Sequence, residues 1–220
     1  MVHDLRPVVA DSSEETDPMQ LVGMLDSPFV RRVAIALTVL GVPFEHRPLS
    51  VFSTFDAFGR INPVVKAPTL VCDDGGVLMD STLILQWAAT LSPRRLQPAG
   101  GAALQHALRL TGLALAVCEK AVQVVYEHKL RPTEKLHAPW LERVTGQLLA
   151  ACALLEDELA RAPLPAPAQE IGDAGITIAV AWDFLQMMVP DTVAAAGYPT
   201  LAAYAEQAER LPAFATLPAR

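Results

Sequence analysis

The chain has 220 residues, 52% of them hydrophobic, and a formal net charge of −7 at pH 7. That hydrophobic content is enough to bury the core of one large globular domain or of two small ones. Nucleic acids and acidic membrane surfaces are bound by clustered Lys and Arg, and the acidic charge balance gives no such basic footprint. We therefore expect neither a nucleic-acid partner nor a membrane partner.

The cysteines and histidines give no sign of a disulfide framework or a metal site. Cys72, Cys118 and Cys152 are odd in number and none belongs to a Cys-x-x-Cys pair, so buried free thiols in a reducing cytosol are expected. No two of the five histidines are four residues apart, so no metal is expected. No apolar run reaches the ~18 residues of a membrane span, and no signal peptide is recognised. These features predict a cytoplasmic protein.

The first elements predicted are a leader, a strand and a helix. Residues 1–18 are acidic with only short apolar pairs, which predicts a mobile leader. Residues 19–25 form an apolar run of strand length. Pro28 suits the first position of a helix, and apolar residues recur at helical spacing until Gly41 supplies a stop.

The next elements complete a small mixed sheet with helices. Residues 44–49 predict an edge-like or irregular strand, because Pro43 just before them and Pro48 within them weaken it as a central one. A short helix is expected near residues 54–60. Residues 69–79 contain two apolar runs around an Asp/Gly loop, which predicts a hairpin, and an amphipathic helix follows to about Thr90. The order β-α-β-α-β-β-α predicts an α/β domain at residues 19–91.

The rest of the chain has the pattern of helices only. Residues 92–101 are rich in Pro and Gly and are predicted to be a linker. Beyond it, strand signals disappear, so residues 102–220 are expected to form an all-helical domain. Apolar periodicity, interrupted by prolines, predicts helices at residues 102–130, 139–161, 177–189 and 201–210.

Three junctions between elements carry residues that could either stabilise the fold or bind a ligand. Ser27 could cap the first helix with its hydroxyl, or donate to a ligand thiolate and lower its pKa. Ala67-Pro68 could mark a strand boundary, or form a cis peptide that presents the Ala67 backbone to a ligand. Asp80-Ser81 could cap a helix, or hold a ligand's ammonium and carboxylate groups.

The order and spacing of these junctions resemble those of a known family. Residues 21–87 resemble the thioredoxin-like N-terminal domain of cytosolic glutathione transferases, and the helical half is similar to their C-terminal domain. Residues 27–33 resemble the first-helix motif of bacterial and plant Ser-type members of the tau and zeta kinds. Residues 62–70 resemble the segment that leads to the cis-proline, and residues 80–85 resemble the acidic-Ser motif.

The resemblance implies a role for each matching residue. Ser27 would be the catalytic residue that stabilises the glutathione thiolate, while Ala67 before a cis Pro68 would pair with the cysteinyl backbone. Lys66 could reach the glycyl carboxylate, or it could equally be a solvated surface lysine. Tyr126 and His128 are candidates for the electrophile pocket, and core packing is equally open for both. The glutathione-binding set implied by the resemblance is Ser27, Phe29, Lys66, Ala67, Pro68, Asp80 and Ser81.

The chain also departs from the family pattern. Members with Cys in place of Ser27 resemble glutaredoxins, so Ser here argues against thiol exchange. Residues 49–58 lack the Lys that tau-class members carry after the second strand. In the helical half Thr177 is expected to cap a buried helix, but Val180 replaces the usual Asp of that capping box. Trp182 is expected in the core.

The resemblance implies a homodimeric glutathione transferase, with glutathione as co-substrate and a role in detoxification of small apolar electrophiles. Two alternatives keep the same pocket. One is a glutathione-dependent isomerase of the zeta kind, in which glutathione is recycled. The other is a non-catalytic binding or scaffolding protein that keeps the fold.

Overall fold

The computed structural model describes residues 18–219, so the predicted leader at residues 1–18 lies almost entirely outside the described residues. In its first half the elements are β1 (Gln20–Val22), α1 (Pro28–Leu40), β2 (Glu45–Arg47), α2 (Phe55–Gly59), β3 (Thr69–Val71), β4 (Val77–Leu78) and α3 (Ser81–Ala88). The second half contains α4 (Gly101–Lys129), η1 (Thr133–Lys135), α5 (Ala138–Arg161), α6 (Asp173–Met188), η2 (Ala195–Gly197), α7 (Pro199–Glu209) and α8 (Pro212–Ala215). The predicted order β-α-β-α-β-β-α followed by helices is confirmed.

The four strands form one mixed sheet in the order β2-β1-β3-β4. Strand β1 runs parallel to β2, with Leu21 opposite His46, and antiparallel to β3, with Leu21 opposite Leu70. Strands β3 and β4 form the antiparallel hairpin that the Asp/Gly loop predicted. Because β2 lies at the edge, the flanking prolines interrupt no central ladder, as the sequence indicated.

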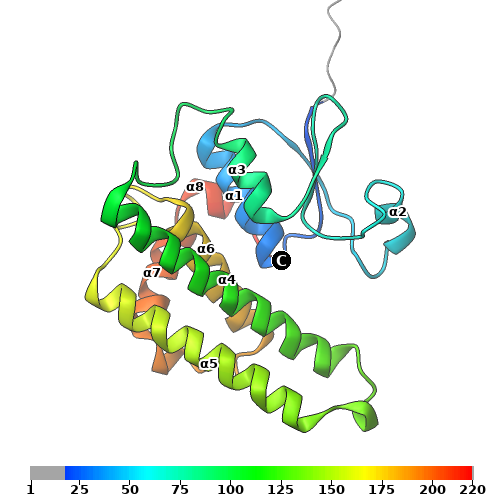
Figure 1. The fold of residues 1–220 in the computed structure, drawn as a ribbon, viewed down its shortest axis with the longest axis vertical. Helices are drawn as coiled ribbons and strands as arrows, with labels where there is room; N and C mark the ends of the chain where they lie inside the picture. Colours follow the sequence, from blue (N-terminus) through cyan, green and yellow to red (C-terminus); the bar gives the residue numbers. More distant parts are fainter. Residues whose placement is uncertain (1–17, 220) are drawn as a thin grey trace, which may run out of the picture.

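Helix α1 is the central element of the first half. Pro28 occupies its first turn, where a missing N–H costs no hydrogen bond, and Gly41 ends it with φ of 72°. The helix packs against α3 on one side and α6 on another, so it is buried around most of its circumference. Figure 1 shows α1 and α3 together beside the sheet and above the long helices.

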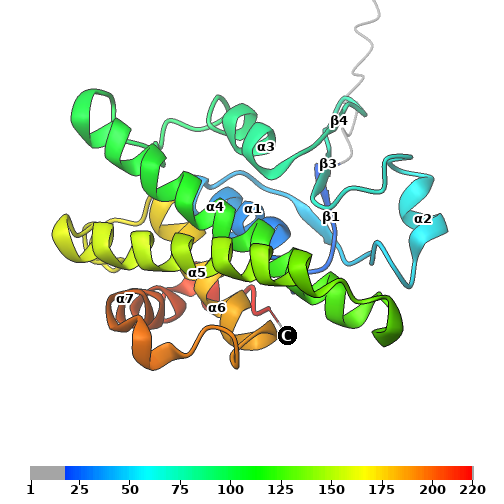
Figure 2. The same cartoon turned by 60° about the horizontal axis from the view of Figure 1, so that its bottom comes forward.

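The second half is built on two long helices. Helices α4 and α5 lie side by side (Figures 1 and 2), and α6 and α7 pack against them. A single cluster of buried apolar side chains continues from the sheet through α1 into these helices. None of the helices in residues 18–219 has the length and apolar character that crossing a membrane requires.

The predicted start of the third long helix is wrong. Helix α6 begins at Asp173 with Gly172 as its N-cap, one turn before Thr177. The Thr177 hydroxyl lies inside the helix and donates to the Asp173 carbonyl oxygen at 2.7 Å. A threonine inside a helix can satisfy its hydroxyl in this way, so its presence did not mark a helix start.

Candidate functional site

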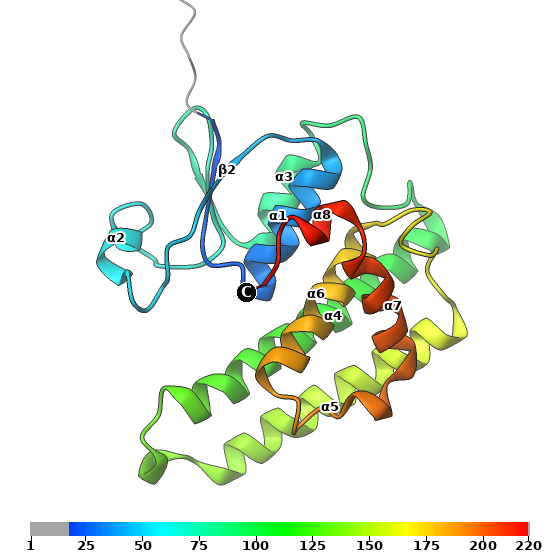
Figure 3. The ribbon, with the colours of Figure 1, turned by 180° about the vertical axis from the view of Figure 1, so that it is seen from behind.

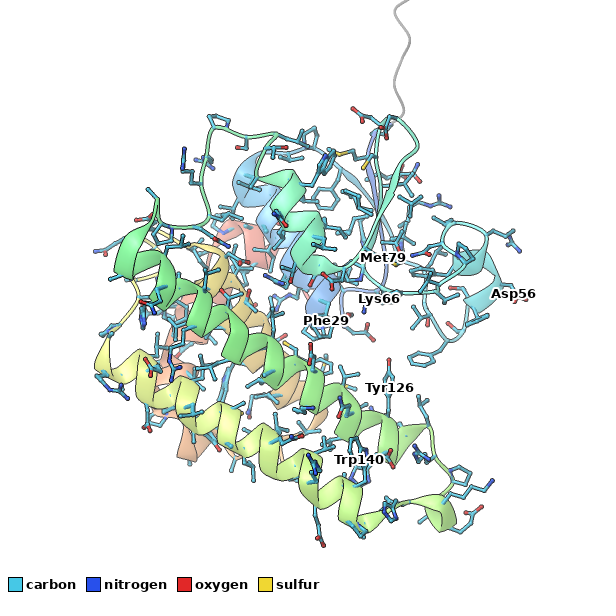
Figure 4. All side chains as sticks on the ribbon, in the orientation of Figure 1. Phe29, Asp56, Lys66, Met79, Tyr126 and Trp140 are labelled. Carbon is cyan, nitrogen blue, oxygen red and sulfur yellow. The ribbon has the colours of Figure 1, made fainter. Side chains whose placement is uncertain are left out.

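A cavity of about 700 Å³ lies between the sheet-containing half and the long helices. Its walls come from the turn before α1, from residues 49–52 and 64–67, and from α4 and α6. Figure 4 shows Phe29 and Lys66 on the side of the first half that faces α4, with Tyr126 rising from α4 toward them. The cavity therefore joins segments that are far apart in the sequence.

Ser27 lies in the wall of this cavity at the N-terminus of α1. It holds the N-cap position with φ of −75° and ψ of 122°, but its side chain makes no capping hydrogen bond. Of the two alternatives for Ser27, the structure therefore does not support capping by the hydroxyl, although the residue does hold the position before α1 that the sequence predicted. A half-buried hydroxyl is left beside the positive end of a 13-residue helix.

Ala67 lies in the same wall, and the Ala67–Pro68 peptide bond is cis, as predicted. Strand β3 begins at Thr69, so Ala67 lies just beyond the ladder that joins β1 to β3. Within residues 18–219 neither the N–H nor the C=O of Ala67 has a hydrogen-bond partner. The backbone there is open for strand-like pairing with a peptide ligand.

Gly23 allows this close arrangement after β1. Its φ is +143°, and a Cβ atom there would lie 2.6 Å from Val30 Cγ2 and 3.2 Å from Ala67 Cβ. A side chain at this position would therefore push on both α1 and the segment that presents Ala67.

Asp80 and Ser81 begin α3, and neither belongs to the cavity wall as it stands. The Asp80 carboxylate accepts from the N–H of Thr82 at 2.9 Å and from that of Leu83 at 3.3 Å, which confirms the predicted N-cap. The buried Ser81 hydroxyl accepts from Arg32 Nη1 at 3.1 Å. Both side chains thus have structural partners, which leaves the second carboxylate oxygen of Asp80 and the proton of Ser81 for a ligand.

The peptide bond between Met79 and Asp80 is also cis, although no proline follows it. Sequence reasoning missed this feature, because no residue type at the position signals it. Asn62 Nδ2 donates to Met79 Sδ at 3.2 Å and to the Thr69 hydroxyl at 2.8 Å. The two cis peptide bonds thus lie on segments joined through one buried asparagine.

Tyr126 is the predicted pocket residue that the structure places most clearly. It is 42% exposed, lines the cavity, and packs edge to face on Phe52 with ring centroids 5.7 Å apart. Burial and the nearby Asp26 carboxylate raise the pKa of its phenol, so the hydroxyl stays protonated at neutral pH. Phe29 and the exposed Lys66 also lie in the cavity wall.

The other predicted pocket residue, His128, and the predicted core residue Trp182 lie elsewhere. His128 is exposed on α4 and is not part of the cavity wall. Trp182 is buried, as expected, with its ring 6.1 Å from that of Tyr198. Several wall residues on α4 and α6 were not predicted, because the sequence does not show which side of each helix faces the cavity. They are Val122, Val125, Lys129, Phe184 and Met188.

The described cysteines are structural rather than reactive. All three are buried and unpaired, as predicted, and burial raises the pKa of both Cys118 and Cys152 to about 12. They remain neutral thiols at physiological pH and lack the thiolate needed for nucleophilic chemistry. Among residues 18–219 no group of His, Cys, Asp and Glu is arranged to hold a metal ion.

Comparisons with known proteins match the first half of the chain by sequence. Residues 21–96 match the model of the glutathione S-transferase N-terminal domain. Glutathione S-transferase U4 of Arabidopsis thaliana is 32% identical over 75 residues, and the uncharacterized GST-like protein YibF of Escherichia coli is 35% identical over 69 residues. These alignments cover 34% and 31% of this chain, and 34% of each relative. They therefore span about a third of the relatives' length.

Comparisons of structure extend over nearly the whole chain. A glutathione transferase family member from Pseudomonas fluorescens Pf-5 with bound glutathione is 29% identical, with a TM-score of 0.78 over 90% of this chain and 98% of that one. A glutathione S-transferase of Methylobacterium radiotolerans in complex with glutathione sulfonate is 27% identical, with a TM-score of 0.79 over 90% and 93%. The sequence of residues 21–96 and the thioredoxin-like plus helical fold thus make the chain similar to glutathione S-transferases.

Proposed function

We propose that this protein is a glutathione transferase that binds glutathione and activates its thiol for attack on a small apolar electrophile. The observation that carries the proposal is the pair of groups that the cavity wall brings together. The wall contains the Ser27 hydroxyl, which makes no capping hydrogen bond at the start of α1, and the Ala67 backbone before the cis Pro68, which has no hydrogen-bond partner among residues 18–219. The glutathione-bound Pseudomonas fluorescens structure, which has the same fold, supports this choice of ligand.

Ser27 supplies the chemistry in this proposal. Its O–H donates to the glutathione sulfur, and the positive end of α1 adds to the field there, so the thiolate is favoured over the thiol. Lowering the thiol pKa by two units would correspond to about 2.7 kcal/mol of differential stabilisation. The thiol proton passes to solvent, and the sulfur electron pair forms a bond to the electrophilic carbon while a leaving group departs from that carbon with its bonding pair. The nucleophile is thus the glutathione sulfur, so the protein needs none of its own.

The remaining predicted residues bind the rest of glutathione. Ala67 pairs with the cysteinyl backbone, Asp80 receives the γ-glutamyl ammonium, and the Ser81 hydroxyl with the first amides of α3 holds its carboxylate. Lys66, which lies exposed in the cavity wall, reaches the glycyl carboxylate. Pro68 and Phe29 shape the site around the sulfur.

The second substrate binds against the helical half. The side chains that α4, its C-cap Leu130 and α6 contribute to the cavity are mostly apolar, which favours an apolar electrophile. They are Val122, Val125, Tyr126, Lys129, Leu130, Phe184 and Met188. In this assignment residues 19–91 bind glutathione and residues 102–220 select the electrophile. The homodimer stays a prediction from the resemblance, and the cytoplasmic location stays a prediction from the composition and pattern of the sequence.

Replacing Ser27 by Ala tests the proposal. Hydrogen bonds to charged groups are worth about 1.5–3 kcal/mol, so the acid dissociation constant of the bound thiol, titrated by the ultraviolet absorbance of the thiolate, should fall at least about tenfold. Glutathione affinity, measured by calorimetry, should change less than about threefold, because most of the peptide contacts remain. Ser53→Ala is a matched control, since Ser53 is exposed and lies outside the cavity wall.

Three outcomes would contradict parts of the proposal. Thiolate absorbance and turnover that survive Ser27→Ala would remove Ser27 from its role. Product analysis that finds a rearranged substrate and no glutathione adduct would indicate the isomerase. Tight glutathione binding without turnover on a panel of electrophiles would indicate the scaffolding protein.

A further inference from the structure

Arg31 connects the start of α1 to the last helices of the chain. Its side chain is 3% exposed and makes four hydrogen bonds to described residues. Nη1 and Nη2 each donate to a different carboxylate oxygen of Glu209 at 2.7 Å, and Nη1 also donates to Asp183 at 3.1 Å. Nε donates to the Leu217 carbonyl oxygen at 2.9 Å, and the guanidinium lies 5.6 Å from the ring centroid of Phe214.

This junction lies one helical turn from Ser27. The backbone N–H of Arg31 donates to the Ser27 carbonyl oxygen at 2.9 Å, which is the first hydrogen bond of α1. Figure 3 shows α8 and the end of the described chain against α1, close to where that helix begins. The C-terminal helices therefore contact the first helix at the end that carries Ser27.

Arg31 and Arg32 hold α1 from two different directions. Neighbouring residues on a helix point about 100° apart, so their side chains cannot serve the same contact. Arg32 reaches Asp173 and Ser81, while Arg31 reaches Glu209 and the chain beyond it. A bidentate guanidinium contact fixes both direction and distance, which a single ammonium group does not.

We propose that Arg31 is a positioning residue for Ser27: its fork to Glu209 fixes the first turn of α1, and with it the direction of the Ser27 hydroxyl. This inference rests on the proposed function, because it concerns the hydrogen bond that Ser27 gives to the sulfur. Arg31 itself does not line the cavity and touches no reacting atom. It acts through the backbone of the helix turn that it anchors.

In one variant, a purely electrostatic effect and the loss of the fork would shift the pKa of the bound thiol in opposite directions, which makes the proposal testable. Glu209→Gln removes a negative charge on the far side of Arg31, so a purely electrostatic effect would lower the pKa of the bound thiol. Loss of the fork would loosen the first turn and raise that pKa. Arg31→Lys keeps the positive charge and loses the fork, so it isolates the geometric effect.

The experiment titrates the thiolate absorbance of bound glutathione in wild type, Arg31→Lys and Glu209→Gln, with kcat and KM measured across pH. We expect the thiolate fraction and kcat/KM below the thiol pKa to fall about tenfold in both variants and to recover at alkaline pH. The KM for glutathione should change less than about threefold, because its peptide contacts are untouched. Glu206→Gln is the matched control, since Glu206 is on the same helix and pairs with Arg210 in solvent.

Each other outcome would overturn the inference. Lower unfolding stability with an unchanged thiol pKa would show a merely structural role for Arg31. A lower pKa in Glu209→Gln would show an effect of charge alone. If Arg31→Lys fails to fold, Glu209→Gln still decides the question, because Gln retains one acceptor oxygen. Wild type that binds glutathione with no thiolate band would instead overturn the proposed role of Ser27 and the inference with it.

Discussion

Arg32 and Asp173 form a buried ion pair that joins α1 to the first residue of α6. Arg32 Nη2 lies 2.7 Å from Asp173 Oδ1, and the two side chains are 1% and 6% exposed. Arg32 Nη1 also donates to Ser81 at the start of α3. One guanidinium thus holds together three helices. Ser27 lies just before the first of them, α1, and the proposed γ-glutamyl site lies at the start of another, α3.

Replacing Asp173 by Asn should strongly destabilise the protein. The variant leaves the buried Arg32 guanidinium without its counter-charge, and removing one partner of a buried pair costs about 3–5 kcal/mol. The free energy of unfolding, measured with urea, should fall by that amount. Glu206→Gln removes an exposed pair and should change it by roughly 0–1 kcal/mol. Equal effects in both variants would contradict a structural role for the buried pair.

Two substitutions of Asp80 should separate its capping role from its proposed binding role. Asn caps a helix about as well as Asp, so Asp80→Asn should leave unfolding stability within about 0.5 kcal/mol while losing the charge that faces the γ-glutamyl ammonium. We expect about tenfold weaker glutathione binding by calorimetry. Asp80→Ala should lose the bonds to Thr82 and Leu83 as well, at a cost of about 1 kcal/mol. Unchanged affinity in Asp80→Asn would remove Asp80 from the site.

Gly23→Ala should disturb both the fold and the site. The new Cβ would lie 2.6 Å from Val30 Cγ2 in a backbone conformation with φ of +143°, and steric strain of this kind costs about 1–3 kcal/mol. The same shift would move Ala67, whose Cβ lies 3.2 Å away, so glutathione affinity should fall too. Urea unfolding and calorimetry measure the two effects.

Gly146 offers the matched control for that substitution. It lies exposed within α5, and a Cβ there would meet nothing within 4 Å. Gly146→Ala should therefore stabilise the protein by up to about 1 kcal/mol through helix propensity, with glutathione binding unchanged. A destabilised Gly146→Ala would show that the loss at Gly23 reflects any added methyl group.

Local chemistry explains which parts of the fold could be predicted from the sequence. Pro28 and Gly41 set the ends of α1 through their own backbone preferences, and the loop before β4 marks a hairpin for the same reason. Such signals lie within a few neighbouring residues. The site junctions at Ser27 and Ala67 were found because each coincides with a boundary of this kind.

The parts that could not be predicted depend on partners far away in the sequence. Arg31 and Glu209 are separated by 178 positions, and nothing near either residue indicates the other. The sequence placed the start of α6 at Thr177, whereas the helix begins at Asp173 after Gly172. Asp173 is held by Arg32 from the first half of the chain, and nothing close to Asp173 in the sequence indicates that contact. The apolar wall of the cavity was missed for a related reason, since helix facing is set by tertiary packing.

Stability should fall at alkaline pH because of buried thiols. Burial raises the pKa of Cys118 from an ordinary 9.0 to about 12, so above pH 9 the unfolded chain releases a proton that the folded chain keeps. The folded state therefore binds more protons, and the free energy of unfolding decreases between about pH 9 and 12, by up to about 1.4 kcal/mol per pH unit for this thiol. Cys152 contributes in the same direction.

Comparing wild type with Cys118→Ala isolates this slope. The smaller side chain of the variant should lower its stability by the same amount at every pH. Because the variant lacks the titrating thiol, its urea-unfolding free energy should decrease less steeply between pH 9 and 10.5. Parallel curves for the two proteins would mean that Cys118 ionises equally in both states, which its burial does not allow.

Phe52 should control binding of the second substrate and leave glutathione binding alone. Its ring packs edge to face on Tyr126 across the cavity, so it connects the loop after β2 to α4 where the electrophile is proposed to lie. An aromatic contact of this geometry contributes about 0.5–1.5 kcal/mol, so Phe52→Ala should raise the KM for an apolar electrophile roughly two- to tenfold. Phe55 is equally exposed at 55% and lies outside the cavity wall, so Phe55→Ala should leave both KM values unchanged. If the two variants behave alike, loss of surface hydrophobicity rather than the contact with Tyr126 explains the effect.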